Sequence, residues 1–105
     1  ATDVILFSAR NATSGDVSSR TSPQTGRINS LRLACQGAAA TSTVAVVIGG
    51  TTYTLTGTSG STAYTVLDSE SVLKTVNVRS VIALTATTVA HPSLDVIASY
   101  SEVIA

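Results

Sequence analysis

Two alternating runs that meet at a pair of glycines constrain the fold of this chain more than any other feature. The run at 43–48 reads Thr-Val-Ala-Val-Val-Ile, and the run at 51–56 reads Thr-Thr-Tyr-Thr-Leu-Thr. Gly49 and Gly50 stand between them. A two-residue turn of the primed type needs positive φ at both positions, which glycine adopts without strain. The pattern therefore predicts a β-hairpin that turns at these two glycines.

Alternation of apolar and polar residues, the period of a β-strand, continues along the rest of the chain, and helical periodicity is absent at any useful length. Further strands are predicted at 4–9, 28–36, 63–67, 74–89 and 94–104. Breaks are predicted as a loop at 57–61, a turn at 68–71, a bulge or kink near Ser80 and a turn at 89–93. About seven short strands predict an all-β fold, either an antiparallel β-sandwich (Ig-like or jelly-roll-like) or a small barrel.

Individual strands predict which side chains enter the core. In the strand at 28–36, Leu31, Leu33 and Cys35 share one face. In the last strand, the residues that share one face are Leu94, Val96, Ala98, Tyr100 and Glu102. The run at 4–9 is apolar on both faces, which is typical of a central or a sandwiched strand.

Size and charge limit the class of protein. The chain has 105 residues, of which 44% are hydrophobic and 11% charged, and its net charge is zero. We expect one domain, residues 1–105, and no nucleic-acid partner, because binding to phosphates needs an excess of Lys and Arg. We also expect no membrane segment, since no apolar run approaches about 18 residues. Residues 1–10 show no basic start before a long apolar stretch, so we expect no signal peptide.

One long polar segment, residues 10–27, does not fit a compact sandwich. It contains a single large apolar residue, Val17, and three of the six basic residues, Arg10, Arg20 and Arg27. A structureless connection of this length is uncommon in a small domain. We expect either a surface loop or an arm that becomes ordered on a neighbouring molecule. In an arm, the three arginines would be the partner-binding residues, because a guanidinium binds carboxylates in a bidentate manner.

The sequence contains few groups suited to catalysis or metal binding. Cys35 lies in a predicted strand on its apolar face, where a free cysteine acts as a small hydrophobic residue. His91, the one histidine, precedes Pro92 in a predicted turn, and we expect it to be solvated. Asp68 and Glu70 are one residue apart, but calcium takes about six to eight oxygen ligands, so we interpret them as part of a capped turn. We therefore expect no enzyme activity, no catalytic residue, no metal and no cofactor.

The chain begins Ala1-Thr2, is rich in Ala, Ser, Thr and Val, and carries the Gly-Gly hairpin Val-Ile-Gly-Gly-Thr-Thr-Tyr at 47–53. In these respects it resembles the small β-rich virion proteins of tailed bacteriophages, and among them the capsid decoration, or cement, proteins. The resemblance spans the whole chain but is compositional, so no functional residue is carried over from it. It implies a structural virion protein on the capsid exterior, made in the host cytoplasm. Such a protein is a homo-oligomer, often a trimer, that bridges neighbouring subunits of the major capsid protein.

In this hypothesis Arg10, Arg20 and Arg27 anchor the chain to acidic groups of the capsid. The strands that bear Leu33, Val46 and Ile82 form a rigid body.

Two alternatives stay open. A carbohydrate- or receptor-binding β-sandwich module would expose aromatic rings for stacking, with Tyr53, Tyr64 and Tyr100 together on one face. Another small structural protein of the phage neck or tail would have the same composition.

Overall fold

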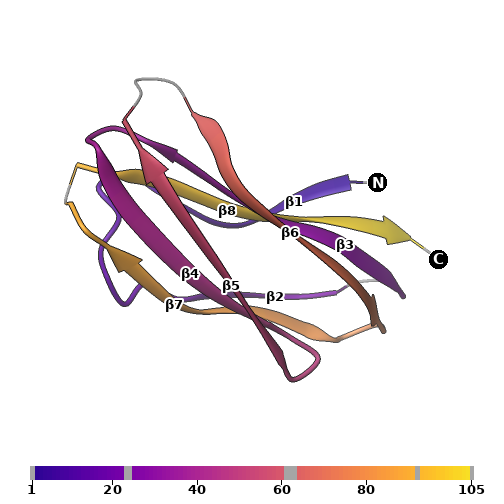
Figure 1. Ribbon diagram of the computed structural model, residues 1–105. Coiled ribbons are helices and arrows are strands. Elements are labelled where there is room, and N and C mark those ends of the chain that lie inside the picture. Colours follow the sequence, from indigo (N-terminus) through magenta and orange to yellow (C-terminus); the bar gives the residue numbers. More distant parts are fainter. Residues whose placement is uncertain (1, 23–24, 61–63, 92, 105) are drawn as a thin grey trace.

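A computed structural model describes residues 2–22, 25–60, 64–91 and 93–104. This part of the chain is built of strands and turns and contains no helix, which confirms the all-β prediction (Figure 1). The strands are β1 (Thr2–Ala9), β2 (Ser18–Thr21), β3 (Gly26–Gln36), β4 (Ala40–Ile48), β5 (Thr51–Ser59), β6 (Thr65–Val76), β7 (Val81–Val89) and β8 (Asp95–Ile104).

The strands form two four-stranded antiparallel sheets packed face to face. The first sheet has the order β1-β8-β3-β6, and the second has the order β2-β7-β4-β5. Strand pairs β4/β5, β3/β6, β2/β7 and β1/β8 are therefore nested around the Gly49-Gly50 turn. This nesting of eight strands is the topology of a jelly roll. Of the architectures expected from the sequence, the structure thus has the jelly-roll sandwich and is not a closed barrel.

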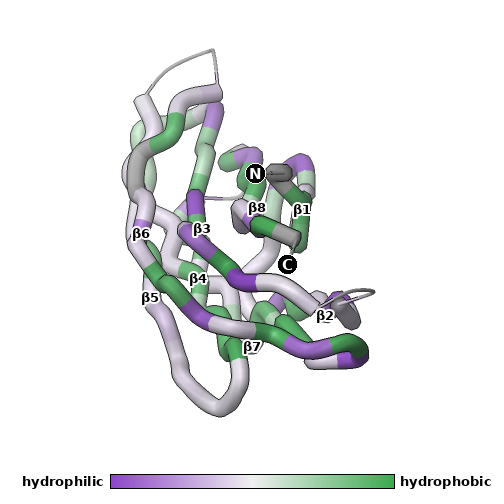
Figure 2. The backbone as a smooth tube through the Cα atoms, turned by 90° about the vertical axis from the view of Figure 1, so that its right-hand side faces the viewer, coloured by the Kyte–Doolittle hydropathy of each residue, from purple (hydrophilic) through white to green (hydrophobic). Residues whose placement is uncertain are grey.

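The core lies between the two sheets and is filled by aliphatic side chains. Leu31, Leu33 and Cys35 of β3 point into it as the alternation predicts, and so does Tyr100 of β8. The second sheet contributes every other residue of β4. Apolar positions, coloured green, recur between polar ones along the strands of both sheets (Figure 2). The fully buried large side chains are Tyr100, Ile28, Leu31, Leu33, Ile48, Leu55, Ile82, Leu84, Leu94, Val44, Val46 and Val96.

Residues 10–27 are attached to the sandwich over much of their length, unlike a free arm. Residues 18–21 form β2, which pairs with β7. Ala12 is buried, and its N–H donates to the Leu94 carbonyl at 2.9 Å. Gly26 and Arg27 already belong to β3. The polar composition of 10–27 concealed β2 because this strand is short and lies at a sheet edge, where one partner strand is enough to hold it.

Several predicted boundaries were wrong. The expected break at 68–71 lies inside β6, and the expected loop at 57–61 begins within β5. The expected single strand at 74–89 is divided by a turn at 77–80, in which the Ser80 N–H donates to the Asn77 carbonyl at 3.0 Å. This turn carries the chain from the first sheet to the second, so it is more than a bulge. Residues 4–9 were expected in a central or a sandwiched strand; β1 is an edge strand of its sheet, so the central placement was wrong. In the predicted turn at 89–93, Pro92 lies outside the described residues.

Candidate protein-binding site

In the nested topology, β1, β3, β5 and β7 all begin at the same end of the elongated sandwich, and β2, β4, β6 and β8 all finish there (Figure 1). The turns at 49–50 and 77–80, the end of β2 and the start of β3 lie at this end. We call it the basic end, because Arg20, Arg27 and Arg79 are exposed at or near it. The acidic side chain described there is Glu102. The net charge of zero is therefore unevenly distributed over the molecule.

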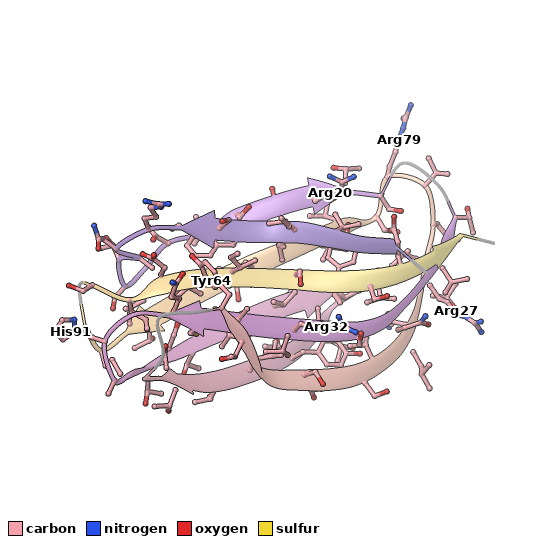
Figure 3. The ribbon with its side chains drawn as sticks, turned by 90° about the horizontal axis from the view of Figure 1, so that it is seen from above. Arg20, Arg27, Arg32, Tyr64, Arg79 and His91 are labelled. Carbon is pink, nitrogen blue, oxygen red and sulfur yellow. The ribbon has the colours of Figure 1, made fainter. Side chains whose placement is uncertain are left out.

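Backbone hydrogen bonds fix the position of Arg79 beside the end of β2. The Arg79 N–H donates to the Ser22 carbonyl at 2.7 Å, and the Ser22 N–H donates to the Ser80 carbonyl at 2.8 Å. The Ser80 hydroxyl also accepts a hydrogen bond from the Asn77 N–H at 2.9 Å. These bonds make the turn at 77–80 a rigid support that holds the Arg79 guanidinium out in solvent (Figure 3).

Arg20 and Arg27 reach the surface from two other strands. Arg20 lies opposite Ile82 in the β2/β7 pair, one step from the start of β7. Arg27 lies opposite Thr75, one step from the end of β6. Figure 3 shows Arg27 and Arg79 at the same end of the molecule and His91 at the opposite end. The basic end thus combines guanidinium groups from both sheets.

Three exposed apolar side chains share the basic end with these arginines. Leu73 is 74% exposed, Val78 52% and Val81 54%. Single exposed apolar residues are ordinary in soluble proteins, but a group of them beside Arg side chains has the composition of a protein interface.

Leu73 is unusual in its backbone as well as in its exposure. Its φ is +49°, in the left-handed region that bulky residues avoid. It belongs to a bulge in β6, where Val72 and Leu73 together lie opposite Asn29. Arg79, at the same end, also has a positive φ of 68°. Strained residues of this kind concentrate at functional sites, because the fold alone does not benefit from them.

Lys74 is not part of this exposed group. It is half-buried, and its side chain lies against the turn of the β4/β5 hairpin. A Cβ atom built on Gly49 would come within 2.7 Å of Lys74 Cε. The Lys74 ammonium group therefore lies beside the Gly49-Gly50 turn.

Arg10, the third arginine predicted to bind a partner, lies at the opposite end. It is exposed just after β1, next in register to Asp95 of β8. The Asp95 carboxylate accepts a 2.9 Å hydrogen bond from the Asn11 N–H. Partial burial and the charge of Asp95 raise the pKa of Tyr64, and the positive charge of Arg10 opposes the shift. Arg10 thus belongs to a local polar group and is separated from Arg20 and Arg27.

A shallow hollow of about 340 Å³ lies at this opposite end. Its lining residues are Asn11, Ala12, Thr13, Ser14, Val89, Ala90 and His91. The Ser14 hydroxyl accepts from the Val89 N–H at 2.9 Å and donates to the Val89 carbonyl, so its hydrogen-bonding capacity is largely used within the protein. His91 Nδ1 accepts from the Ser93 N–H at 3.1 Å. This hydrogen bond uses Nδ1 as an acceptor within the turn.

The other candidate chemical groups are Cys35 and the acidic pair Asp68 and Glu70. Cys35 is buried as predicted, and its burial raises the pKa of the thiol. A thiol in such a place is a poor nucleophile. Among the residues that the structure describes, no three His, Cys, Asp or Glu side chains are grouped to hold a metal ion. Asp68 and Glu70 lie within β6, so their interpretation as part of a capped turn was wrong. The side chain of Asp68 lies outside the described part of the chain.

The three tyrosines do not share a face. Tyr100 is buried in the core, and Tyr53 of β5 is half-buried against it. Tyr64 is the exposed one, at 43%, and lies over the outer face of the first sheet (Figure 3). The structure therefore does not provide the aromatic platform expected of a sugar-binding module.

Sequence reasoning selected Arg20 and Arg27 but missed Leu73, Val78, Arg79 and Val81. The usable signal was an interruption of alternation, since residues 72–73 are both apolar and 77–80 contains two polar residues that favour turns. That signal indicates an irregularity but does not say which end of the sheet it occupies.

In the part of the chain that the structure describes, no helix is long and apolar enough to cross a membrane. Comparisons with family models, with curated protein sequences and with solved structures found no match to this chain.

Proposed function

We propose that the protein is a structural component of a virus particle, of the capsid decoration or cement class, and that its basic end binds the major capsid protein. The proposed attachment site rests on one observation: the side chain of Leu73 is exposed, and its backbone is held in a left-handed conformation. Strain of this kind costs about 1–3 kcal/mol. A partner that covers the leucine would offset part of that cost.

The chemistry of the basic end defines its partner. Arg27 and Arg79 fit carboxylates, which they can bind in a bidentate manner. Leu73 fits an apolar depression between such carboxylates. An acidic surface on the exterior of a capsid subunit, with a shallow apolar centre, satisfies both requirements. The protein would act there after synthesis in the host cytoplasm, and many copies would each contribute a modest attachment.

The virion setting itself rests on the compositional resemblance to phage decoration proteins. The jelly-roll architecture is compatible with it, because this architecture occurs in viral capsid domains, although it also occurs in lectins and cupins. The alternative of a carbohydrate- or receptor-binding module has less support, since Tyr100 is in the core and Tyr53 packs against it. A neck or tail structural protein would use the same basic end on a different virion partner.

The proposal predicts a defined location for the protein. Mass spectrometry of purified particles should detect the chain at a copy number that matches the symmetry of the head. An electron-microscopy map should show eight-stranded sandwiches on the outer surface of the shell. Absence of the chain from the particles would overturn the virion assignment, and density at the neck or tail would move the assignment to the structural alternative.

Charge reversal tests the attachment site separately. The double variant Arg27→Glu/Arg79→Glu should bind capsid shells about tenfold or more weakly at low salt, because each exposed ion pair contributes about 0.2–1 kcal/mol and reversal adds repulsion. The difference should shrink as salt is raised. Arg10→Glu is the matched control at the opposite end and should bind like the unmodified chain. Equal binding by all three proteins would exclude the basic end as the attachment site.

A further inference from the structure

Three buried hydroxyl groups lie on the inner face of the second sheet. They belong to Ser42 of β4, Ser59 of β5 and Thr87 of β7, and no more than 2% of each residue is exposed. Among the residues that the structure describes, none of the three hydroxyl oxygens has a hydrogen-bond partner. A buried hydroxyl that gives up its hydrogen bonds to water without gaining others destabilises the folded state.

The strand register places these hydroxyls in one diagonal row, which we call the hydroxyl row. Ser42 lies opposite Gly57 in the β4/β5 pair, and Ser59 is the next inward residue along β5. On its other side Ser42 lies opposite Val89 in the β4/β7 pair, and Thr87 is the neighbouring inward residue of β7. Ser59 and Thr87 are therefore both diagonal neighbours of Ser42 on the same face.

The hydroxyl row interrupts an aliphatic surface. Toward the basic end, the inward positions of the same three strands hold Val44, Val46, Ile48, Leu55, Ile82 and Leu84. An aliphatic residue at each position of the row would have continued this surface without an unpaired oxygen. The polar groups are thus gathered at one level of the sheet, in the half farther from the basic end.

The spacing of the hydroxyl row favours a bridging molecule over direct bonds. Diagonal neighbours in a sheet have Cβ atoms about 7 Å apart. At that separation two hydroxyls do not come within the about 2.8 Å of an O–H···O hydrogen bond. Two successive bonds through one water molecule span about 5 Å, which matches the distance left between the oxygens.

Gly57 leaves space for such a molecule. It is buried, faces the core directly opposite Ser42, and adds no side chain there. The register between β4 and β5 has no shift, so this glycine does not serve a bulge. Glycine in the interior of a regular strand weakens the strand, and one reason for its presence is the close approach of a ligand.

We propose that the hydroxyl row is an internal water-binding site, with one molecule beside Gly57 between Ser42 and Ser59 and a second between Ser42 and Thr87. Ser42 has one donor and two acceptor positions, so its hydroxyl can bond to both molecules. Buried water commonly satisfies polar groups that have no other partner, and it then forms part of the structure. The site joins β5, β4 and β7 within the core and does not depend on the proposed virion function.

The test is oxygen-17 relaxation dispersion of water in solutions of the complete chain, which detects internal molecules with long residence times. The unmodified chain should show both molecules. Ser42→Ala removes the hydroxyl that they share and should lose both. Gly57→Ala places a methyl group beside Ser42 and should lose the first molecule.

Thr87→Val and Thr88→Val are a matched pair, because they make the same change at adjacent positions of β7, one buried and one exposed. Thr87→Val should lose the second molecule, and Thr88→Val should keep both. Circular dichroism checks that the variants fold, and the unmodified chain decides if one of them does not. An unmodified chain without long-lived water, or a dispersion that Ser42→Ala leaves unchanged, would overturn the proposal. Ser42→Ala should bind capsid shells like the unmodified chain, so this result is separate from the test of the proposed function.

Discussion

The hydroxyl of Ser18 donates a 2.6 Å hydrogen bond to the backbone carbonyl of Leu6. Ser18 begins β2 in the second sheet, and Leu6 is the extra residue of the β1 bulge in the first. A bulged residue has no partner in the strand ladder, so its carbonyl needs another donor. The Ser18 hydroxyl supplies that donor and at the same time joins the two sheets along the side where β1 and β2 are both edge strands.

Ser18→Ala should therefore lower the free energy of unfolding by about 0.5–1.5 kcal/mol, the usual net contribution of one intramolecular hydrogen bond. Urea titration followed by circular dichroism measures the change. Ser19→Ala is the control, because Ser19 is exposed in the same strand and its loss should cost less than about 0.5 kcal/mol. If both variants lose the same stability, the hydrogen bond does not join the sheets in solution.

Gly37 and Gly50 should respond very differently to alanine. Both have positive φ, +119° and +81°. A Cβ on Gly50 would meet no atom within 4 Å. Gly50→Ala should therefore lower the free energy of unfolding only by the backbone strain of a positive φ, about 1 kcal/mol. A Cβ on Gly37 would clash with the backbone carbonyl of Ser93, which a side-chain movement cannot relieve. Gly37→Ala should therefore lower the melting temperature by more than twice as much as Gly50→Ala. Equal decreases for the two variants would contradict the close packing of Gly37 against the Ser93 carbonyl.

The parts of the fold that could be predicted are determined by local sequence patterns, whereas the missed parts are determined by contacts between distant segments. The Gly49-Gly50 hairpin and the inward face of β3 are encoded locally, by turn chemistry and by burial of alternate residues such as Leu31 and Leu33. β2 is not encoded in this way, because its burial pattern shows no core-facing residue. It is a strand because β7 offers a ladder of backbone partners, and that is a consequence of the completed topology.

The same distinction applies to the candidate site. Arg20 and Arg27 could be selected because they stand in a segment that composition marks as exposed. Arg79 and Leu73 could not, because their importance comes from a sheet-crossing turn and a bulge that bring them to the same end. Arg10 was selected by the same composition and lies at the other end. Composition indicates exposure, but the order of the strands decides which exposed residues are neighbours.

Tyr100→Phe should leave the protein equally stable or more stable at neutral pH, by up to about 1 kcal/mol. The Tyr100 hydroxyl is buried and has no hydrogen-bond partner. Removing a buried, unpaired polar group together with its desolvation cost is neutral or favourable. Thermal and urea unfolding measure the change. A loss of more than about 1 kcal/mol would show that the hydroxyl is bonded in solution, for example through a buried water.

The same variant should change the response to alkaline pH. Burial raises the pKa of Tyr100 above its ordinary value of 10.0, the negative charge of Glu102 adds to the shift, and the positive charge of Arg20 opposes it. The folded state thus holds this proton more tightly than the unfolded chain. The resulting stability is complete below pH 10.0 and is lost as pH rises through the folded-state pKa. Tyr100→Phe should lack this loss. The remaining decline should begin near pH 9.0 with Cys35 and continue with Tyr64, because the pKa of each of these groups is also raised in the folded state.

Leu73→Gly should separate stability from binding. Glycine adopts the positive φ of this position without strain, whereas a bulky residue there costs about 1–2 kcal/mol. Because Leu73 is 74% exposed, its removal sacrifices little packing. We expect the free energy of unfolding to stay the same or to rise by up to about 1 kcal/mol after the entropy cost of glycine is included. Urea titration measures this part of the prediction.

Binding to capsid shells should move in the opposite direction. Full burial of a leucine in an interface contributes about 1.5–3 kcal/mol, so Leu73→Gly should weaken binding by about tenfold or more. Val17→Gly is the control, because Val17 is exposed to a similar degree in the connection between β1 and β2, at the opposite end of the sandwich. It should bind shells like the unmodified chain. A Leu73→Gly protein that melts earlier and still binds normally would show that the bulge serves the fold, and the attachment site would then have to lie elsewhere.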